Sequence, residues 1–418
     1  MGDAGLPPLQ PLPEPHITNI SDGIHLLEPL SRRGHGLGLV ILTSGNASAE
    51  ESISIKNYVP PPLVKWAEEG YAVAQIQQAA LSSSSNGLKL AVDALKQCSK
   101  RDAGKIGIVA YDVSLWQQIE SSIASFPELA GAIIYSDAQI GVVSSPLPCV
   151  QHLHGKASSK LPRSPKLTAY EYPTSTSQTF ASPVSPDFDY SLEAVSHTRN
   201  LTFLKRHDIL GGPTFDLEEI WDEHTYYEFG NRSVQHTMAT MVQEPYVNHV
   251  PTMTGGIGRE ALTHFYTHNF VYSNPADTEL ELISRTVGVD RIVDEFIFKC
   301  THDRMMDWLL PAVPPTGVYL EISMIAIVCI RGDRLYHEHI SWDQGTVLRQ
   351  IEILPEYLAW PYRVPEEKYV EGSSNNTDAE KQRLELQLPI AGKDTANKMR
   401  EKNSVLSNKM FEHRMRRL

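Results

Sequence analysis

The sequence predicts two domains, an α/β domain with a parallel sheet followed by an α+β domain shaped as a cone-like barrel. The chain has 418 residues, too many for one ordinary hydrophobic core. In the first half, short apolar runs alternate with helical stretches, as in parallel sheets covered by helices. In the second half, helical stretches come first and longer β-rich stretches follow. We place the domains at residues 14–206 and 217–362, with a linker at 207–216 and a charged, partly disordered tail at 363–418.

Composition narrows the possible classes of function. The hydrophobic fraction of 41% is that of a globular protein, and no run of about 18 apolar residues could span a bilayer. A formal charge of −13 argues against a general nucleic-acid binder. The N-terminal residues are acidic and proline-rich and do not resemble a signal peptide. Four widely spaced cysteines fit reduced thiols, and we expect a cytoplasmic protein without nucleic-acid or membrane partners.

The elements of the first domain follow from apolar runs and their boundaries. Residues 37–42 form an apolar run that ends at Ser44-Gly45, which is typical of a buried strand. A helix is predicted at residues 62–69 because Gly70 follows it, and a strand comes next at 71–76. Helical spacing at 88–98 and further buried strands at 106–109 and 132–135 complete the alternation. This order predicts a parallel sheet with helices on both faces.

A strand at residues 105–111 runs into a turn and then a helix, the position where α/β-hydrolases hold their nucleophile. Further segments occur in matching order, namely Trp66-Ala-Glu-Glu-Gly-Tyr-Ala-Val, Cys149-Val-Gln-His-Leu-His-Gly155, Tyr170-Glu-Tyr-Pro173 and residues 194–205. On these segments the first domain resembles the dienelactone hydrolase (carboxymethylenebutenolidase) family. The resemblance implies an α/β hydrolase-like fold with a catalytic triad.

The triad departs from the family pattern. At the position of the family's cysteine nucleophile this sequence has Asp112, and the triad aspartate falls on Ala157 or Ser158. The triad histidine falls within residues 174–178, which contain no histidine. An aspartate can act as a nucleophile, but the second step needs a base to activate water, and none is visible. We expect a degenerate hydrolase domain, with ester or lactone hydrolysis through Asp112 as the alternative.

The second domain begins with helices and ends with strands. Residues 215–229 predict an acidic helix with Trp221, His224 and Glu228 along one side. A helical stretch at 234–241, a loop at 246–256 and a short helix at 258–266 follow. Strands are predicted at 282–287, 291–300, 318–330 and 334–342, the last two joined by the turn Arg331-Gly332-Asp333. Helices followed by a curved antiparallel sheet predict a cone-shaped barrel.

Several short segments in this domain carry a second resemblance. They are Tyr227-Glu-Phe, Asn248-His-Val-Pro, Thr254-Gly-Gly-Ile-Gly258, Thr301-His302, Pro314-Pro-Thr-Gly317, Arg331-Gly-Asp-Arg-Leu, His337-Glu-His-Ile, and Asp343 with Leu348 and Gln350. Through them the domain resembles the SnoaL-like polyketide cyclases, which have the nuclear transport factor 2-like fold. The resemblance implies a catalytic carboxylate at Asp343 and a pocket whose activity varies between cyclases, isomerases, dehydratases and binders.

Alternation along the last strand assigns its side chains to two faces. One face carries Leu335, His337, His339, Ser341 and Asp343, and the other carries Glu338 and Trp342. Two imidazoles and a carboxylate that line a concave apolar pocket form a plausible proton-transfer set. We therefore predict Asp343, His339 and His337 as catalytic residues, and His249, His302, Tyr227 and Trp342 as substrate-binding residues.

Other interpretations of these residues stay open. Asp343 precedes the helical run 344–350 and could cap that helix instead. His337 and His339 could be hydrogen-bonded structural histidines. A histidine pair at this spacing, with Asp343 or His302, is also a common metal-binding pattern.

The favoured hypothesis is cofactor-free acid–base chemistry, namely cyclisation, isomerisation or dehydration of a hydrophobic carbonyl or polyketide-type compound. It requires no cofactor and no metal. The alternatives are hydrolysis through Asp112 and a non-catalytic module that binds a small molecule or forms a homodimer through the sheet of the second domain.

Overall fold

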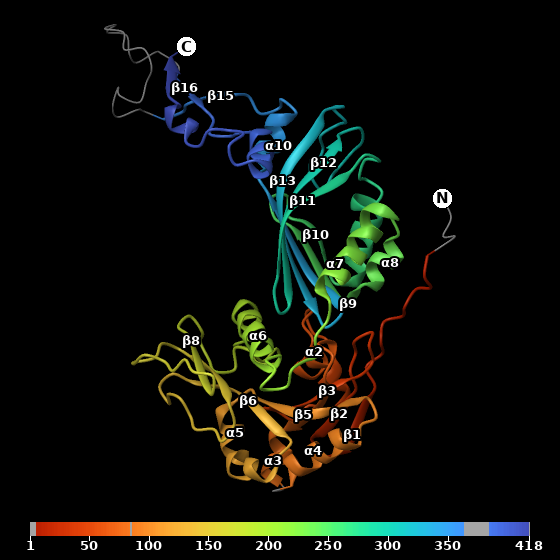
Figure 1. Cartoon of the computed structure of the whole chain (residues 1–418), viewed down its shortest axis with the longest axis vertical. Coiled ribbons are helices and arrows are strands. Elements are labelled where there is room, and N and C mark those ends of the chain that lie inside the picture. The colour runs from red at the N-terminus through yellow and green to blue at the C-terminus, as the bar shows by residue number, and fades with distance from the viewer. Residues whose placement is uncertain (1–5, 84–85, 363–383, 418) are drawn as a thin grey trace.

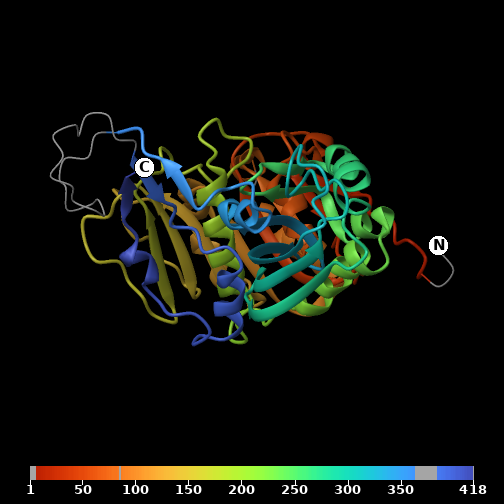
Figure 2. The same ribbon diagram turned by 90° about the horizontal axis from the view of Figure 1, so that it is seen from above.

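Two large sheets, one in each half of the chain, organise the structure. The computed structural model describes residues 6–83, 86–362 and 384–417. The first domain lies below the second along the long axis of the molecule, and helices α2 and α6 lie where the two meet (Figure 1). Seen from above, the C-terminal segment and the N-terminal residues lie at opposite ends of the molecule (Figure 2).

The first domain contains an eight-stranded sheet with the order β1-β2-β4-β3-β5-β6-β7-β8. Its strands are β1 (Ile17–Ser21), β2 (Ile24–Leu27), β3 (Gly36–Thr43), β4 (Ala72–Gln77), β5 (Arg101–Ala110), β6 (Leu129–Asp137), β7 (Cys149–His154) and β8 (Leu167–Tyr172). Strands β1 and β2 are antiparallel at one edge, and every pair from β4 to β8 is parallel. The predicted parallel sheet is therefore confirmed.

Helices cover both faces of this sheet, as predicted. They are α1 (Ala49–Ile53), α2 (Pro62–Glu68), α3 (Gln78–Ser83), α4 (Gly87–Gln97), α5 (Val113–Ile119), η1 (Glu120–Ser125) and α6 (Tyr190–Leu204). Apolar side chains of α4 and α5 form one core layer with the sheet, and those of α2 and α6 form the other. The resemblance of this domain to dienelactone hydrolases stays a prediction.

The second domain contains a six-stranded sheet with the order β10-β9-β14-β13-β12-β11. Its strands are β9 (Met241–His249), β10 (Thr254–Ile257), β11 (Glu279–Val287), β12 (Arg291–Thr301), β13 (Tyr319–Arg331) and β14 (Arg334–Trp342). Its helices are α7 (Leu217–Thr225), η2 (Tyr226–Gly230), α8 (Val234–Ala239), α9 (Arg259–Phe265), η3 (Tyr266–Phe270) and α10 (Gln344–Gln350). Helices α7 and α8 lie along one side of the curved sheet, which matches the predicted helix-then-sheet layout (Figure 1).

Two expectations for the second sheet were wrong. Residues 246–256 are not a loop, because most of them belong to strands β9 and β10, which pair with each other. Nor is the sheet wholly antiparallel, because β9 runs parallel to β14. The Gly255-Gly256 pair suggested a break, but it lies inside the hairpin. A Cβ at Gly255 would lie 2.0 Å from the carbonyl oxygen of Val247, so the close approach of the strands explains this glycine.

Residues beyond the second domain also form regular elements. Strands β15 (Tyr357–Ala359), β16 (Leu384–Gln387) and β17 (Met415–Arg417) make a small antiparallel sheet, with α11 (Asp394–Arg400) and η5 (Lys409–Glu412) nearby in the chain. Arg400 forms ion pairs with Glu281 and Glu321, at 2.8 and 2.6 Å, which attach the basic tail to the second sheet. The predicted disorder concerns in part residues 363–383, which lie outside the described residues.

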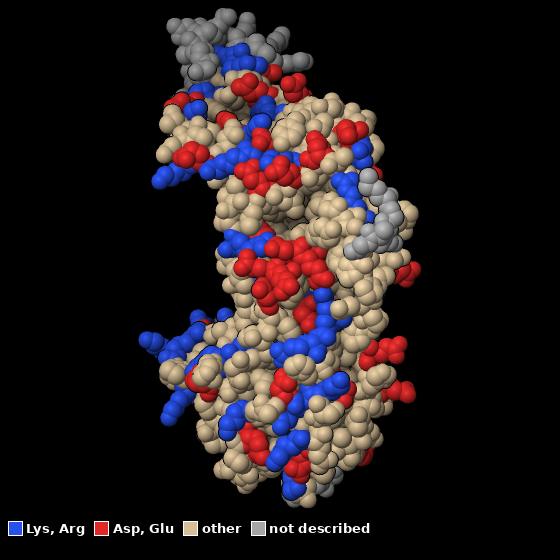
Figure 3. Space-filling model, turned by 45° about the vertical axis from the view of Figure 1, so that its right-hand side comes forward, with Lys and Arg blue, Asp and Glu red and all other residues tan. Residues whose placement is uncertain are grey.

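Surface charge and hydropathy add two observations. Figure 3 shows acidic side chains clustered near the middle of one face of the molecule, while basic side chains are spread along it. This clustering would repel a polyanion at that part of the surface. Among the described residues, no helix combines the length and the apolar character needed to cross a membrane.

Buried His152 on β7 makes the first domain sensitive to acid. Its Nδ1 lies 2.7 Å from the Tyr172 hydroxyl and its Nε2 lies 2.6 Å from Asn200 Oδ1. Burial lowers the pKa of His152 to about 3, against about 6.5 in an unfolded chain. Between these two pKa values the unfolded state therefore binds one more proton at His152 than the folded state does. The stability of the protein falls as the pH drops below about 6.5.

We predict that between about pH 7 and pH 5 the melting temperature of His152→Gln falls less than that of the wild type, even if the variant is less stable at pH 7. The measurement is thermal unfolding across this pH range. As a control, substitution of the exposed His207 by glutamine should keep the wild-type slope. A wild-type slope in His152→Gln would contradict the assignment.

Candidate functional site at the domain junction

The turn between β13 and β14 inserts into the first domain. Arg331 Nη1 donates a 2.8 Å hydrogen bond to Glu68 Oε2 at the end of α2, and both side chains are buried. The Arg331 guanidinium also lies over the ring of Tyr336, 3.6 Å from its centroid. In this short turn the second domain thus contributes a fully buried charge to the first.

Gly332 allows the turn to approach α2 closely. Its backbone has φ +57°, and a Cβ there would lie only 2.3 Å from the carbonyl oxygen of Glu68. The Gly332 N–H donates to Glu69 Oε2 at 3.2 Å. Asp333 accepts hydrogen bonds from the backbone N–H groups of Arg32 and Arg33 at 2.9 and 3.2 Å. Glycine is therefore required at this position by both backbone conformation and space.

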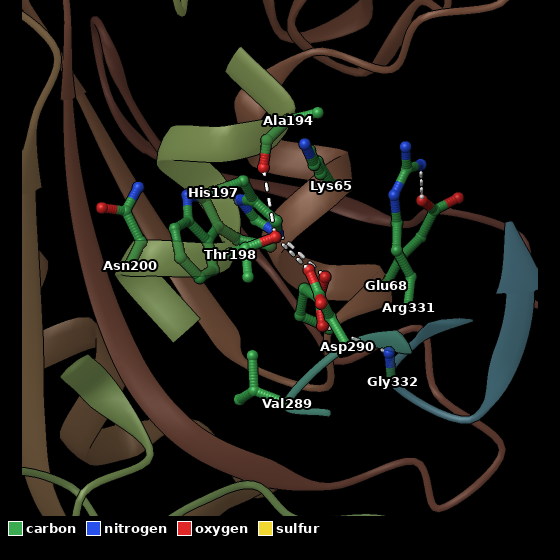
Figure 4. Close-up of polar contacts among 12 residues, drawn as sticks. Lys65, Glu68, Ala194, His197, Thr198, Asn200, Val289, Asp290, Arg331 and Gly332 are labelled. Atoms are coloured by element: carbon green, nitrogen blue, oxygen red, sulfur yellow. Dashed lines mark hydrogen bonds and ion pairs between the residues drawn. The ribbon is translucent and has the colours of Figure 1, made fainter. Parts of the chain in front are cut away.

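Helix α6 forms the other half of the junction (Figure 4). Thr198 Oγ1 donates to Asp290 Oδ2 at 2.6 Å, and Lys205 Nζ donates to the carbonyl oxygen of Val289 at 3.1 Å. The hydroxyl groups of Tyr190 and Tyr336 lie 2.6 Å apart. Hydrogen bonds from two helices thus fix the orientation of the second domain on the first.

Burial shifts the pKa values of the ionisable side chains at the junction. It raises the pKa values of the Glu68 and Glu69 carboxyl groups, although Arg331 opposes the shift at both. For Glu193, burial is outweighed mainly by Lys65 at 2.6 Å, so its pKa is lowered. Burial and then Lys65 hold the pKa of His197 well below its usual range, so a neutral imidazole lies 2.9 Å from Glu69.

A cavity of about 270 Å³ lies beside the Glu68–Arg331 pair. Its apolar walls come from both domains and from the N-terminal segment, through Leu12, Pro13, Pro15, Leu30, Ile53, Ile55, Val64 and Val242. Its polar lining is Glu68, Gln243, Glu244, Arg331 and Arg334. The volume is near the lower end of about 300–1,000 Å³ typical of small-molecule sites, which often lie between domains.

In this junction cavity, Arg334 is a buried positive charge that lacks close partners for part of its guanidinium. It is 5% exposed, and its Nε has no hydrogen-bond partner among the described residues. Its Nη1 donates to the Leu30 carbonyl oxygen at 3.0 Å, and its nearest carboxylate, Asp333, is 3.8 Å away. Burial lowers the pKa of Arg334. A ligand oxygen at this end of the cavity would supply the missing partner.

Glu244 supplies a carboxylate to the same cavity. It lies on β9 and is half-buried, and it interacts electrostatically with Arg259 but forms no hydrogen bond or ion pair with a described residue. The Glu68 carboxylate, in contrast, is bound to Arg331. An apolar cavity with one available carboxylate and two guanidinium groups can remove a proton and stabilise the resulting oxyanion.

The predicted catalytic histidines do not line the interior of the cone, which corrects that expectation. Residues facing the core of the second domain include Ile340 and Trp342, together with Met324 and Val328 of β13. The register shifts near His337, so Leu335 also joins this core and simple alternation fails there. His337 and His339 lie on the opposite face with their rings stacked, centroids 4.7 Å apart.

His337 lies at the edge of the junction rather than in the junction cavity. It lines a smaller cavity together with Lys65, His197 and Cys329, of about 30 Å³, far below the volumes typical of small-molecule sites. Burial, then the neighbouring His339, lowers the pKa of His337 to about 3. Its ring is therefore neutral at ordinary pH, and a catalytic role for the histidine pair stays a prediction.

Asp343 lies at the surface and caps helix α10. Its carboxylate accepts hydrogen bonds from the backbone N–H groups of Gly345 and Thr346, at 3.0 and 3.2 Å, and from the Thr346 hydroxyl at 2.6 Å. This is the capping geometry that the sequence allowed as an alternative. The carboxylate does not face the cone interior, and its predicted catalytic role has no geometric support.

The predicted substrate-binding residues His249 and Trp342 are core residues. His249 lies 4.9 Å from Trp308 and 5.4 Å from Phe270, measured between ring centroids, and burial lowers its pKa to about 3. Trp342 packs edge-on against Trp308 at 5.6 Å. These rings fill the part of the cone where the sequence predicted a substrate, so both residues pack against neighbouring side chains there.

His302 and Tyr227 are not brought together with the other candidates. His302 is fully buried, with Nδ1 3.1 Å from the Thr316 hydroxyl, and it supports the connection between β12 and β13. Tyr227 packs against His236 with ring centroids 5.0 Å apart, under the N-terminal segment. Neither side chain lines the junction cavity.

Asp112 caps helix α5 in the first domain. It accepts hydrogen bonds from the backbone N–H of Ser114 at 2.7 Å and from Gln178 Nε2 at 3.0 Å. Its backbone, at φ −151° and ψ 134°, is ordinary extended chain and lacks the strained turn of a nucleophile elbow. None of these partners titrates, so hydrolysis through Asp112 has no base in this geometry.

Sequence inspection missed the residues that form the junction cavity. Glu68 and Arg331 are separated by 263 positions, and no local pattern joins them. The only signal was the Arg331-Gly332-Asp333 turn, which was interpreted as a hairpin connection and as part of the second resemblance, and not as a contact with the first domain. Among the described residues, the one histidine–carboxylate group with metal-ligand spacing lies elsewhere, inside the second domain.

Comparisons with known proteins concern one third of the chain. No protein-family model and no curated protein sequence matches it. A nuclear transport factor 2-like protein of unknown function from Burkholderia pseudomallei is 17% identical, with a TM-score of 0.27, over 33% of this chain and 98% of its own. The likeness is one of fold.

Two further solved structures are similar. A proposed SnoaL-like polyketide cyclase from Jannaschia is 15% identical over 34% of this chain and 99% of its own, with a TM-score of 0.27. IdmH, a proposed polyketide cyclase from Streptomyces antibioticus, is 15% identical over 33% of this chain and 99% of its own, with a TM-score of 0.28. The hydrolase resemblance of the first domain stays unconfirmed by these structures.

The turn at Gly332 gives a direct test of the junction. Gly332→Ala should lower the free energy of unfolding by at least about 2 kcal/mol more than Gly34→Ala, because displacing the turn disturbs the buried ion pair. Gly34 has a similar φ of +68°, and a Cβ added there would have no atom within 4 Å, so it isolates the backbone strain alone. The measurement is thermal and denaturant unfolding of both variants. Equal losses would show that the turn does not hold the junction.

Capping by Asp343 predicts a contrast between two substitutions. Asp343→Ala should destabilise the protein by about 1 kcal/mol, whereas Asp343→Asn should change stability by only a few tenths, because asparagine also caps helices well. Denaturant unfolding measures both. A large loss in Asp343→Asn would show that the negative charge, rather than the cap, matters at this position.

Proposed function

We propose that the protein is a cofactor-free acid–base enzyme that acts at the junction cavity on a small apolar carbonyl compound. The observation that carries this proposal is one apolar cavity in which an available carboxylate, Glu244, and the under-compensated guanidinium of Arg334 occur together. Buried charges aimed at a developing oxyanion are effective because they need no reorganisation.

In the proposed reaction, Glu244 removes a proton from a carbon next to a carbonyl group. The electron pair of that C–H bond moves onto the carbonyl oxygen, where Arg334 and Arg331 stabilise the enolate. The protonated Glu244 then returns its proton to another carbon or to a departing oxygen. Isomerisation, cyclisation and dehydration share this first step, so the cavity is compatible with each of the three reaction classes predicted from the sequence.

Proton abstraction is testable without knowledge of the final product. We predict that the protein catalyses deuterium exchange from D₂O into the acidic C–H position of aryl or cyclic 1,3-diketones, followed by NMR. Glu244→Gln should reduce the exchange rate about 100-fold or more, and Arg334→Lys should reduce it less. Substitution of the exposed Glu260 by glutamine should keep the wild-type rate.

Two results would contradict this proposal. Exchange that persists in Glu244→Gln and is lost in Asp343→Asn would return the catalytic role to Asp343. A compound that binds wild-type protein, loses affinity in Arg334→Lys and never exchanges would show a binding protein rather than an enzyme. Loss of both binding and exchange in a variant with an unchanged melting temperature supports the junction cavity as the site.

A further inference from the structure

A buried group of four side chains joins four elements of the second domain. His224 lies near the end of α7, Glu228 in η2, Tyr266 at the start of η3, and Glu338 on β14. All four side chains are at most 4% exposed. None of them lines the junction cavity, and the proposed acid–base chemistry does not use them. Because isolated buried charges are costly, the charges within such a group must balance one another.

Four polar atoms of this group lie close together. His224 Nε2 lies 3.2 Å from Glu228 Oε1 and 3.1 Å from Glu338 Oε1. The Tyr266 hydroxyl lies 3.5 Å from His224 Nε2 and 3.3 Å from Glu338 Oε1. The imidazole nitrogen and the two carboxylate oxygens all lie within 4.8 Å of one another.

Thr240 fixes the tautomer of the imidazole. Its hydroxyl donates to the Thr237 carbonyl oxygen at 2.7 Å, so it can only accept from His224 Nδ1, at 2.6 Å. The proton on Nδ1 leaves a lone pair on Nε2 in the neutral ring, and this lone pair faces two carboxylates. A proton or a metal ion must therefore lie between them; the proton would sit on Nε2 or on Glu228, whose pKa is raised by burial. A ligating histidine is oriented by its second nitrogen in the same way.

The distances fit the spacing of ligands around a metal ion. Charge-assisted N–H···O hydrogen bonds are about 2.7–2.9 Å long, and buried pairs elsewhere in this protein agree, with 2.6 Å for Lys65–Glu193 and 2.8 Å for Arg331–Glu68. The contacts around His224 are longer, from 3.1 to 3.5 Å. Zinc bound at about 2.0–2.1 Å by nitrogen and oxygen ligands places neighbouring tetrahedral ligands about 3.3–3.4 Å apart.

We propose that His224, Glu228, Glu338 and Tyr266 bind one divalent metal ion, preferably Zn²⁺. Two carboxylates neutralise the charge of the ion, and four protein ligands leave no open position, which is the pattern of a structural site. The ion would tie α7, η2 and η3 to β14, and its binding energy would add to folding stability. With a proton in its place, the pKa of His224 would be about 10, since Glu228 and Glu338 outweigh the effect of burial.

The test uses the full chain, depleted of metal by a chelator in mild denaturant and refolded. We expect elemental analysis after reconstitution with ZnCl₂ to find about one zinc ion per chain, and zinc to raise the melting temperature of the depleted protein. Glu338→Gln and His224→Asn should lower zinc affinity more than about 100-fold, because each removes a ligand. Asp294→Asn is the matched control. It changes another buried carboxylate of the same domain, one held by Arg285 and Trp221.

Three outcomes distinguish a bound zinc ion from a proton. Metal-depleted wild-type protein that neither binds zinc nor gains stability from it would overturn the proposal and leave a proton on His224 or Glu228. Zinc bound equally by wild type, Glu338→Gln and His224→Asn would also overturn it, because the ion would then lie elsewhere. If the variants do not fold, Co²⁺ substitution of the wild type decides, since a tetrahedral absorption spectrum supports the site and an octahedral, solvent-like spectrum contradicts it.

Discussion

The buried ion pair between Glu68 and Arg331 determines how the two halves of this chain sit on each other. In water such a pair would contribute little, because solvent screens it. At the junction both side chains are less than 10% exposed, so removing either one would leave an unpaired buried charge. Gly332 then lets the turn approach α2 within hydrogen-bonding distance of Glu69. The junction cavity lies beside this turn, with lining residues from both β9 and α2.

Charge compensation at the junction limits how the cavity can open. Glu69 accepts from Gly332 and contacts neutral His197, and Glu193 is paired with Lys65. Separating the domains would break the contacts of Gly332 with Glu69 and of Arg331 with Glu68, which both cross the junction. The N-terminal segment forms the remaining wall through residues 12–15, and one hydrogen bond of 3.0 Å, from His236 to the Pro7 carbonyl oxygen, attaches it to the second domain. Displacing that segment is the less costly route for a ligand.

Much of the fold was predictable because local patterns determine it. Apolar runs flanked by glycine predicted the parallel strands of the first domain, and the acidic helix at α7 was visible from its spacing. Predictions failed where tertiary pairing overrides local signals. Strands β9 and β10 contain proline and paired glycines, which favour a loop in isolation, yet β9 is held by its parallel pairing with β14. Pairing partners distant in sequence cannot be recovered from composition.

The candidate sites depended on details that a single sequence does not contain. Glu338 and Asp343 are both acidic and only five positions apart, and alternation assigned them to opposite faces of the strand. The shift in register before His337 brings Glu338, rather than the two histidines, toward His224 inside the domain. Asp343 follows the end of the strand, where its carboxylate is exposed and caps a helix. Whether a carboxylate is reactive, structural or metal-binding depends on the groups that face it. Here the irregular pairing in β14 before His337 determines which side chains of the strand face the interior of the domain.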